Sequence, residues 1–95
     1  MHIKFADQPP IYDGDDFALH FTALVDARPV VCSISAEALE DHFGAASARE
    51  DDLLQAFEQG RARIRSVCAE ALDSSGGQSV VLRSGLFRVA GMEPE

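Results

Sequence analysis

Apolar and polar residues alternate along the first third of the chain with the period of two that is typical of β-strands. Residues 3–5 show this alternation briefly, and residues 30–34 show it again after a turn at 26–29. The alternation is strongest over residues 17–25, where one face carries only apolar side chains, namely Phe17, Leu19, Phe21, Ala23 and Val25. The pattern therefore predicts three strands, each with one face against a hydrophobic core.

The turn at 26–29 also predicts how the second and third strands pair. A four-residue loop there gives the antiparallel pairs Val25–Val30, Ala23–Cys32, Thr22–Ser33 and Phe21–Ile34. In this register the apolar partners all fall on the same face of the sheet, which stabilises the pairing.

Helical spacing replaces the alternation in the middle of the chain. Ser35 is a suitable N-cap for a short helix, and Gly44 is suited to end it. Ser47 and Glu50 then form the S-x-x-E pattern of a capping box, which predicts the start of a longer helix. Apolar residues recur at helical spacing until a stop at residues 74–77.

The length of this second helix conflicts with the size of the domain. A continuous helix over residues 48–73 would measure about 39 Å, whereas a domain of this size is only about 32 Å across. We therefore expect the helix either to bend near Gly60 or to project beyond the domain.

The last part of the chain predicts a second hairpin. A two-residue turn at Ser84 and Gly85 fits between two short alternating segments. The resulting pairs are Leu82–Phe87 and Val80–Val89.

Together these elements predict an α+β fold with two layers. An antiparallel sheet is expected in the order β-β-β-α-α-β-β, with one short and one long helix packed on one face. Residues 1–95 are predicted to form a single domain with its core at about residues 2–90, a loop at 8–16 and a loose tail at 91–95.

The composition is typical of a folded domain, and the net charge limits the classes of partner that the domain can bind. The 95 residues are 46% hydrophobic and 25% charged, which are typical globular proportions. The net charge of −8 repels nucleic-acid backbones, so we expect no nucleic-acid partner. No stretch has the pattern of a signal peptide or the roughly twenty apolar residues of a membrane span, so we expect no membrane contact and a cytoplasmic location.

Several short motifs are similar to those of a known family. They are Phe21-x-Ala23, Val30-x-Cys32-x-Ile34-Ser35, Glu37-Ala38-Leu39, Phe43 and Phe57-x-x-x-Arg61-x-x-Ile64. With these motifs the chain resembles the small bacterial domain-of-unknown-function family numbered 1488, over roughly residues 3–88. The resemblance implies a compact α+β domain, and it supplies no activity, cofactor or catalytic residue.

Two features of the sequence could belong to a metal site: the acidic run at residues 13–16, Asp-Gly-Asp-Asp, and the two cysteines. An EF-hand loop needs ligands at alternate positions, Gly at the sixth and Glu at the twelfth, and the acidic run lacks that pattern. Cys32 and Cys68 fit no C-x-x-C spacing. We therefore predict a solvated acidic turn, two reduced and buried cysteines, and no catalytic, cofactor-binding or metal residues.

One group on the polar face of the second strand is a candidate binding site. His20 lies on that face, and the register above places Thr22 and Ser33 beside it. A hydroxyl near an imidazole is a combination that hydrolytic sites use. The other histidines, His2 and His42, are predicted to lie on the surface like His20, and the three have no zinc-binding spacing.

Arg61, Arg63 and Arg65 form the only local basic run. Helical geometry places Arg61 and Arg65 on one face and Arg63 on another, and Glu58 is spaced to pair with Arg61. The run predicts an ordinary solvated helix face. The alternative is an acid-seeking contact with a second subunit or another protein.

Two functions from different classes remain open. The first is an interaction module without catalytic activity, whose partner is an unknown protein or a second copy of the chain bound through the overlong helix. The alternative is a small-molecule-binding or hydrolytic protein that uses the polar strand face around His20. Known catalytic and nucleotide-binding motifs are absent from the sequence, which favours the first function.

Overall fold

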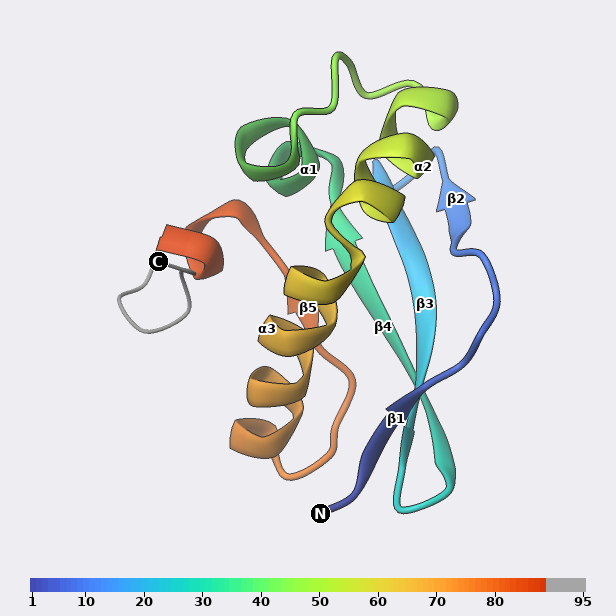
Figure 1. The fold of residues 1–95 in the computed structure, drawn as a ribbon, viewed down its shortest axis with the longest axis vertical. Helices are drawn as coiled ribbons and strands as arrows, with labels where there is room; N and C mark the ends of the chain where they lie inside the picture. Colours follow the sequence, from blue (N-terminus) through green and yellow to red (C-terminus); the bar gives the residue numbers. More distant parts are fainter. Residues whose placement is uncertain (89–95) are drawn as a thin grey trace.

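Residues 1–88, which the computed structural model describes, form a five-stranded sheet with the helices on one of its faces (Figure 1). The strands are β1 (Ile3–Phe5), β2 (Ile11–Asp13), β3 (Ala18–Val25), β4 (Arg28–Ser35) and β5 (Val81–Leu82). The helices are α1 (Ala36–Phe43), α2 (Glu50–Gln59) and α3 (Arg61–Ser75), followed by the 3-10 helix η1 (Ser84–Arg88). The predicted α+β class is confirmed, while the order of elements differs in detail. Val89 and the predicted tail at 91–95 lie outside the described residues.

The sheet is mixed rather than wholly antiparallel. Its order is β1-β3-β4-β5, and β2 also pairs with β3. β1 pairs with the last residues of β3 and β2 with its first residues, so these two short strands lie along the same edge of β3. β4 and β5 are parallel, because the three α-helices between them supply the long crossover that a parallel pair requires.

The antiparallel hairpin predicted at the end of the chain is wrong. β5 has two residues and pairs with β4, and η1 replaces the expected second strand. The reason is tertiary packing. The ring of Phe87 is fully buried and meets the ring of Phe43 edge-on, with centroids 5.3 Å apart. Packing of this kind routinely overrides a local turn preference.

A tight turn between β3 and β4 shifts their predicted register by two residues. Asp26 and Ala27 form the turn with positive φ angles of 51° and 70°, which is the conformation of a two-residue type I′ hairpin. Phe21 therefore pairs with Cys32 rather than with Ile34. Because the shift is even, the apolar side chains stay on the predicted face.

The loop predicted at residues 8–16 contains strand β2, and the start of β3 is also different from the prediction. Phe17 was predicted on the buried face of β3, but it precedes the strand, has a φ of 51° and is 60% exposed. The chain reverses direction here between two paired strands. The backbone carbonyl of Phe17 accepts a hydrogen bond of 2.8 Å from the N–H of Ala36, which attaches this turn to α1.

Gly60 divides the predicted long helix into α2 and α3, so of the two expected alternatives the structure has the interruption at Gly60. The ring of Phe43, at the end of α1, packs against the backbone at this point. A Cβ on Gly60 would lie 2.1 Å from Cδ1 of that ring. Only glycine leaves room for the ring, so the chain can turn here and keep both helices against the sheet.

The ends of α1 are as predicted, whereas the start of α2 is not. The hydroxyl of Ser35 accepts a hydrogen bond of 3.1 Å from the N–H of Ala38, and α1 ends at Gly44 in the left-handed conformation. The predicted capping box is wrong, because α2 begins only at Glu50. The Ser47 hydroxyl instead donates to the carboxylate of Asp52 at 2.7 Å, and an ionised acceptor makes the stronger hydrogen bond.

One hydrophobic core lies between the sheet and the helices. Cys32 of β4 and Cys68 of α3 are both buried in it as free thiols, which confirms the prediction for the cysteines. The hydrogen bond with Cys32, together with burial, raises the pKa of the Cys68 thiol. None of the helices in the described part of the chain combines the length and the apolar composition that a membrane span requires.

Candidate functional site

The face of the sheet opposite the helices carries exposed aliphatic side chains. Ile11 is 71% exposed, Val31 is 56% exposed and Val81 is 52% exposed. They come from three different strands. Ile11 is opposite His20 in the β2–β3 register, and Val81 is opposite Ser33 in the β4–β5 register. We call the surface formed by Ile11, His20, Val31, Ser33 and Val81 the open face.

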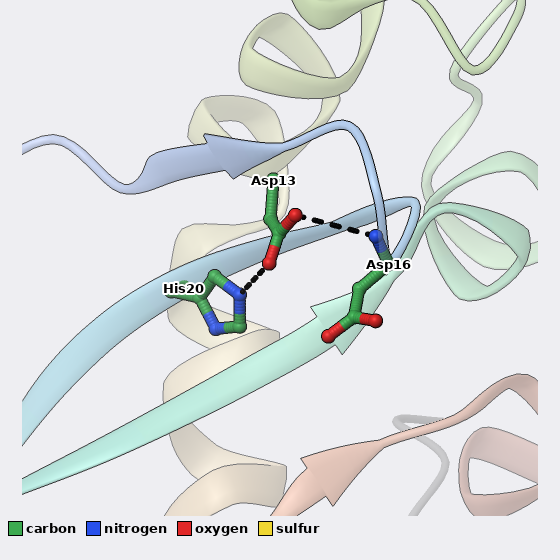
Figure 2. A group of neighbouring side chains, drawn as sticks. All are labelled: Asp13, Asp16 and His20. Atoms are coloured by element: carbon green, nitrogen blue, oxygen red, sulfur yellow. Dashed lines mark hydrogen bonds and ion pairs between the residues drawn. The ribbon is translucent and has the colours of Figure 1, made fainter.

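At one end of the open face, the turn between β2 and β3 brings Asp13 to His20 (Figure 2). Asp13 Oδ2 lies 2.9 Å from His20 Nε2. Asp13 Oδ1 accepts hydrogen bonds from the backbone N–H groups of Asp15 at 3.0 Å and Asp16 at 3.2 Å. The hydrogen bond with His20, followed by that from Asp16, holds the pKa of Asp13 below its ordinary value. Asp13 is therefore ionised at neutral pH, and His20 Nε2 donates to it.

A hollow of about 310 Å³ lies on the open face beside this turn. Its lining consists of Asp16, Ala18, Ser33, Ser35, Val81 and Arg83. Ser33 is only 8% exposed, and its hydroxyl has no hydrogen-bond partner among residues 1–88. Ser33 Oγ is not among the fully buried unpartnered atoms of the described residues, so it can be reached from the hollow. The hollow thus presents an unused hydroxyl, a carboxylate and a guanidinium to a bound molecule.

The family of the chain follows from its sequence match. The model of the family described as "Protein of unknown function (DUF1488)" matches residues 3–82. The chain belongs to the DUF1488 family. A crystal structure of a DUF1488 protein of unknown function from Shewanella loihica PV-4 is similar to it, with a TM-score of 0.74 and 26% sequence identity. That similarity covers 87% of this chain and 97% of the other. None of the curated proteins matches the chain.

In this DUF1488 domain, the structure changes the predicted site around His20. His20 is opposite Ser33 across β3 and β4, whereas Thr22 is opposite Val31. No hydrogen bond within the described part of the chain joins His20 to either hydroxyl, because its Nε2 contacts Asp13. A hydrolytic site needs its nucleophile within hydrogen-bond reach of its base. The arrangement therefore supports binding better than hydrolysis.

A second cluster has the composition of a catalytic triad but not its geometry. Ser84 Oγ donates to Asp41 Oδ2 at 2.6 Å, and His42 Nε2 lies 3.2 Å from Ser84 Oγ and 3.1 Å from its carbonyl oxygen. In a triad the carboxylate orients the histidine, whereas this carboxylate contacts the serine, which is buried. These bonds attach η1 to α1. His42, predicted on the surface, is partly buried for this reason.

The three arginines of the basic run in α3 each make a different contact. Arg61 forms an ion pair with Glu58, as predicted. The guanidinium of Arg63 lies over the ring of Phe43, 5.3 Å from its centroid, and Arg65 lies over a phenylalanine of β1. Cation–π contacts of this kind stabilise the packing of α3 on its neighbours.

The DUF1488 match includes Asp13, Asp16, His20 and Ser33 within residues 3–82. Sequence reasoning missed that the two aspartates lie beside the histidine. A signal was present, because the β-prone residues Ile11 and Tyr12 directly precede an Asp-Gly pair, which favours a turn into a second strand. The two prolines before this segment favoured a loop and obscured that signal.

Proposed function

We propose that this DUF1488 domain is a binding module without catalytic activity, whose open face docks a segment of a partner protein that carries both apolar and basic side chains. The observation that carries the proposal is the exposure of Ile11, Val31 and Val81 on a single sheet face that no helix within residues 1–88 covers. Large exposed apolar side chains on one face, with polar residues between and around them, are typical of interaction sites.

The charge of the chain favours a basic partner over a second copy. The net charge is −8, and Asp13, Asp15 and Asp16 lie in the turn at the end of the open face. Two copies bound through this face would each carry the same excess of negative charge, whereas a basic segment would be attracted. The expectation of a dimer rested on an overlong helix, and the break at Gly60 removes that reason.

Phe17 adds a second argument for binding at this end of the molecule. It lies between Asp16 and Ala18, which line the hollow. An aromatic residue with a positive φ is strained, and such strain is concentrated at functional sites. Its exposed ring is also the kind of large, rigid side chain that anchors protein interfaces.

The first test uses a photo-crosslinking amino acid placed at Val31 in the chain expressed in its native host. Ser66, exposed on α3, is the helix-side control position. We expect adducts with one particular protein from Val31 and none from Ser66. With that protein purified, Val31→Lys should weaken binding by about tenfold or more, because it removes apolar contact and repels a basic segment. Ser66→Lys introduces the same charge and should leave binding unchanged.

Two results would overturn this proposal. Adducts in equal yield from both positions, or from Ser66 alone, would show that the open face does not select the partner. Adducts between two copies, with a concentration-dependent dimer in light scattering, would show that a second copy occupies this face instead of a basic segment.

A further inference from the structure

Asp13, Asp16 and His20 bring three metal-ligating side chains together where the turn between β2 and β3 meets the sheet (Figure 2). One ligand atom from each, two carboxylate oxygens and one imidazole nitrogen, all lie within 4.8 Å of one another. Asp13 ends β2, Asp16 lies in the turn and His20 lies on β3. Three different parts of the backbone therefore converge on one point.

We propose that these three side chains bind a divalent first-row transition-metal ion. Two carboxylates and an imidazole suit Mn²⁺, Fe²⁺, Co²⁺, Ni²⁺ or Zn²⁺, whereas Ca²⁺ and Mg²⁺ prefer oxygen ligands alone. Asp13 Oδ2 and His20 Nε2 are 2.9 Å apart. Two ligands at right angles around an ion, with bonds of about 2.1 Å, would lie about 3.0 Å apart. An ion can thus replace the proton between these atoms without a movement of the strands.

The hollow beside the cluster is an independent sign that a ligand binds here. Asp16 belongs both to the cluster and to the lining of the hollow. Ser33, in the same lining, is 8% exposed as a whole residue, and its hydroxyl has no partner among the residues that the structure describes. Its oxygen is not one of the fully buried unpartnered atoms, so it is open to a molecule in the hollow. Three protein ligands leave further coordination positions of an ion open. Water or a small anionic ligand in the hollow can fill such positions and also satisfy the serine.

Asp16 distinguishes a metal site from a purely structural contact. The pair of Asp13 and His20 joins β2 to β3 by itself, so its presence fits either role. The backbone N–H of Asp16 donates to Asp13, but the Asp16 carboxylate takes part in no hydrogen bond or ion pair within residues 1–88. A structural contact does not need this carboxylate, whereas the proposed metal site does.

The experiment titrates the full-length chain, first treated with a chelator, with Co²⁺, Ni²⁺ and Zn²⁺ by isothermal titration calorimetry. Ca²⁺ and Mg²⁺ serve as comparison ions. We expect one transition-metal ion to bind per chain. Asp16→Asn should lower the affinity by at least the roughly tenfold that the loss of even an outer ligand contact costs.

Two variants serve as controls. Asp15→Asn removes the same charge from the same turn but lies outside the cluster, so it should keep the wild-type affinity. His2→Ala should also keep it, and this variant tests whether the chain terminus binds the ion instead.

The melting temperature separates a loss of binding from a loss of fold. Without metal, Asp16→Asn should melt at the same temperature as the wild type. The ion should raise the melting temperature of the wild type and of Asp15→Asn by mass action, and not that of Asp16→Asn.

The proposal is overturned by any of three results: no stoichiometric binding of a transition-metal ion, an equal loss of affinity in the two aspartate variants, or the disappearance of binding in His2→Ala. It goes beyond the proposed docking function and does not depend on it. The two proposals share Asp13, Asp16 and His20, but docking is carried by the exposure of Ile11, Val31 and Val81, which take no part in binding the ion.

Discussion

Gly60 shows how a single residue shapes the helical layer. Its φ of −103° is accessible to any amino acid, so the backbone conformation does not require glycine. The ring of Phe43 does require it, because a Cβ would overlap that ring. The ring is held in place by the edge of Phe87 and by the guanidinium of Arg63 above it. In a close-packed interior such a ring has little space to move away.

Gly60→Ala is therefore expected to lower the free energy of unfolding by about 1–3 kcal/mol, the usual cost of overpacking. Urea denaturation measures this change. Gly85→Ala is the matched control, because a Cβ there meets nothing within 4 Å and the φ of Gly85 lies outside the left-handed region. It should change stability by no more than about 0.5 kcal/mol. Equal effects at the two glycines would show that the Phe43 ring yields without cost.

Among the elements, the first two of the three α-helices begin for different reasons. α1 begins at an N-cap that the sequence shows, because the Ser35 hydroxyl and the N–H it binds are three residues apart. α2 begins at Glu50 with Arg49 as an N-cap that makes no side-chain hydrogen bond. The start of α2 depends on the loop that connects it to α1 and on the hydrogen bond from the Ser47 hydroxyl to the Asp52 carboxylate. The S-x-x-E pattern thus fails to predict a helix start here, because the serine hydroxyl binds a nearby carboxylate instead of capping the helix.

Ser35→Ala is expected to cost about 1 kcal/mol of stability, because it leaves a backbone N–H of α1 without its acceptor. Ser74→Ala is the control, since Ser74 is exposed near the end of α3 and its hydroxyl has no partner in the described part of the chain. Thermal or urea denaturation of both variants gives the comparison. A loss at Ser35 no larger than that at Ser74 would contradict the role assigned to this cap.

At the scale of the whole molecule, the sheet and the helices close over both thiols. Cys32 comes from β4 and Cys68 from α3, and both are almost completely buried. The interaction with Cys32 and the apolar surroundings raise the pKa of Cys68. A thiol reagent reacts with the thiolate, so this thiol is protected by its protonation as well as by its burial.

Both cysteines are therefore expected to react with a thiol reagent roughly a thousandfold or more slowly in the folded chain than in urea, because only opened molecules expose them. The absorbance of the released chromophore follows the reaction. A Ser66→Cys variant supplies an exposed thiol in the same fold, which should react at once. Rapid reaction of Cys32 or Cys68 in native buffer would show that the core opens locally around α3.

The apolar faces of the strands and helices can be derived from the order of residues alone. Every second position on β3 is apolar, and this alternation places Leu19, Phe21, Ala23 and Val25 against the helices whichever turn joins β3 to β4. Gly44 and Gly76 end their helices in the left-handed conformation, as their positions after helical runs predict. Periodicity and caps are local properties, so a single sequence carries them.

The contacts between residues that are distant in the chain depend on the folded molecule as a whole. The packing of Phe87 replaced a predicted strand by η1, and the ring of Phe43 explains why the helix divides at Gly60. The pairing of β2 with β3 brought Asp13 and Asp16 to His20. Such contacts form only when several elements pack against one another, so they depend on the shapes of side chains from distant parts of the chain. The spacing of residues along the chain predicts local structure and does not predict these contacts.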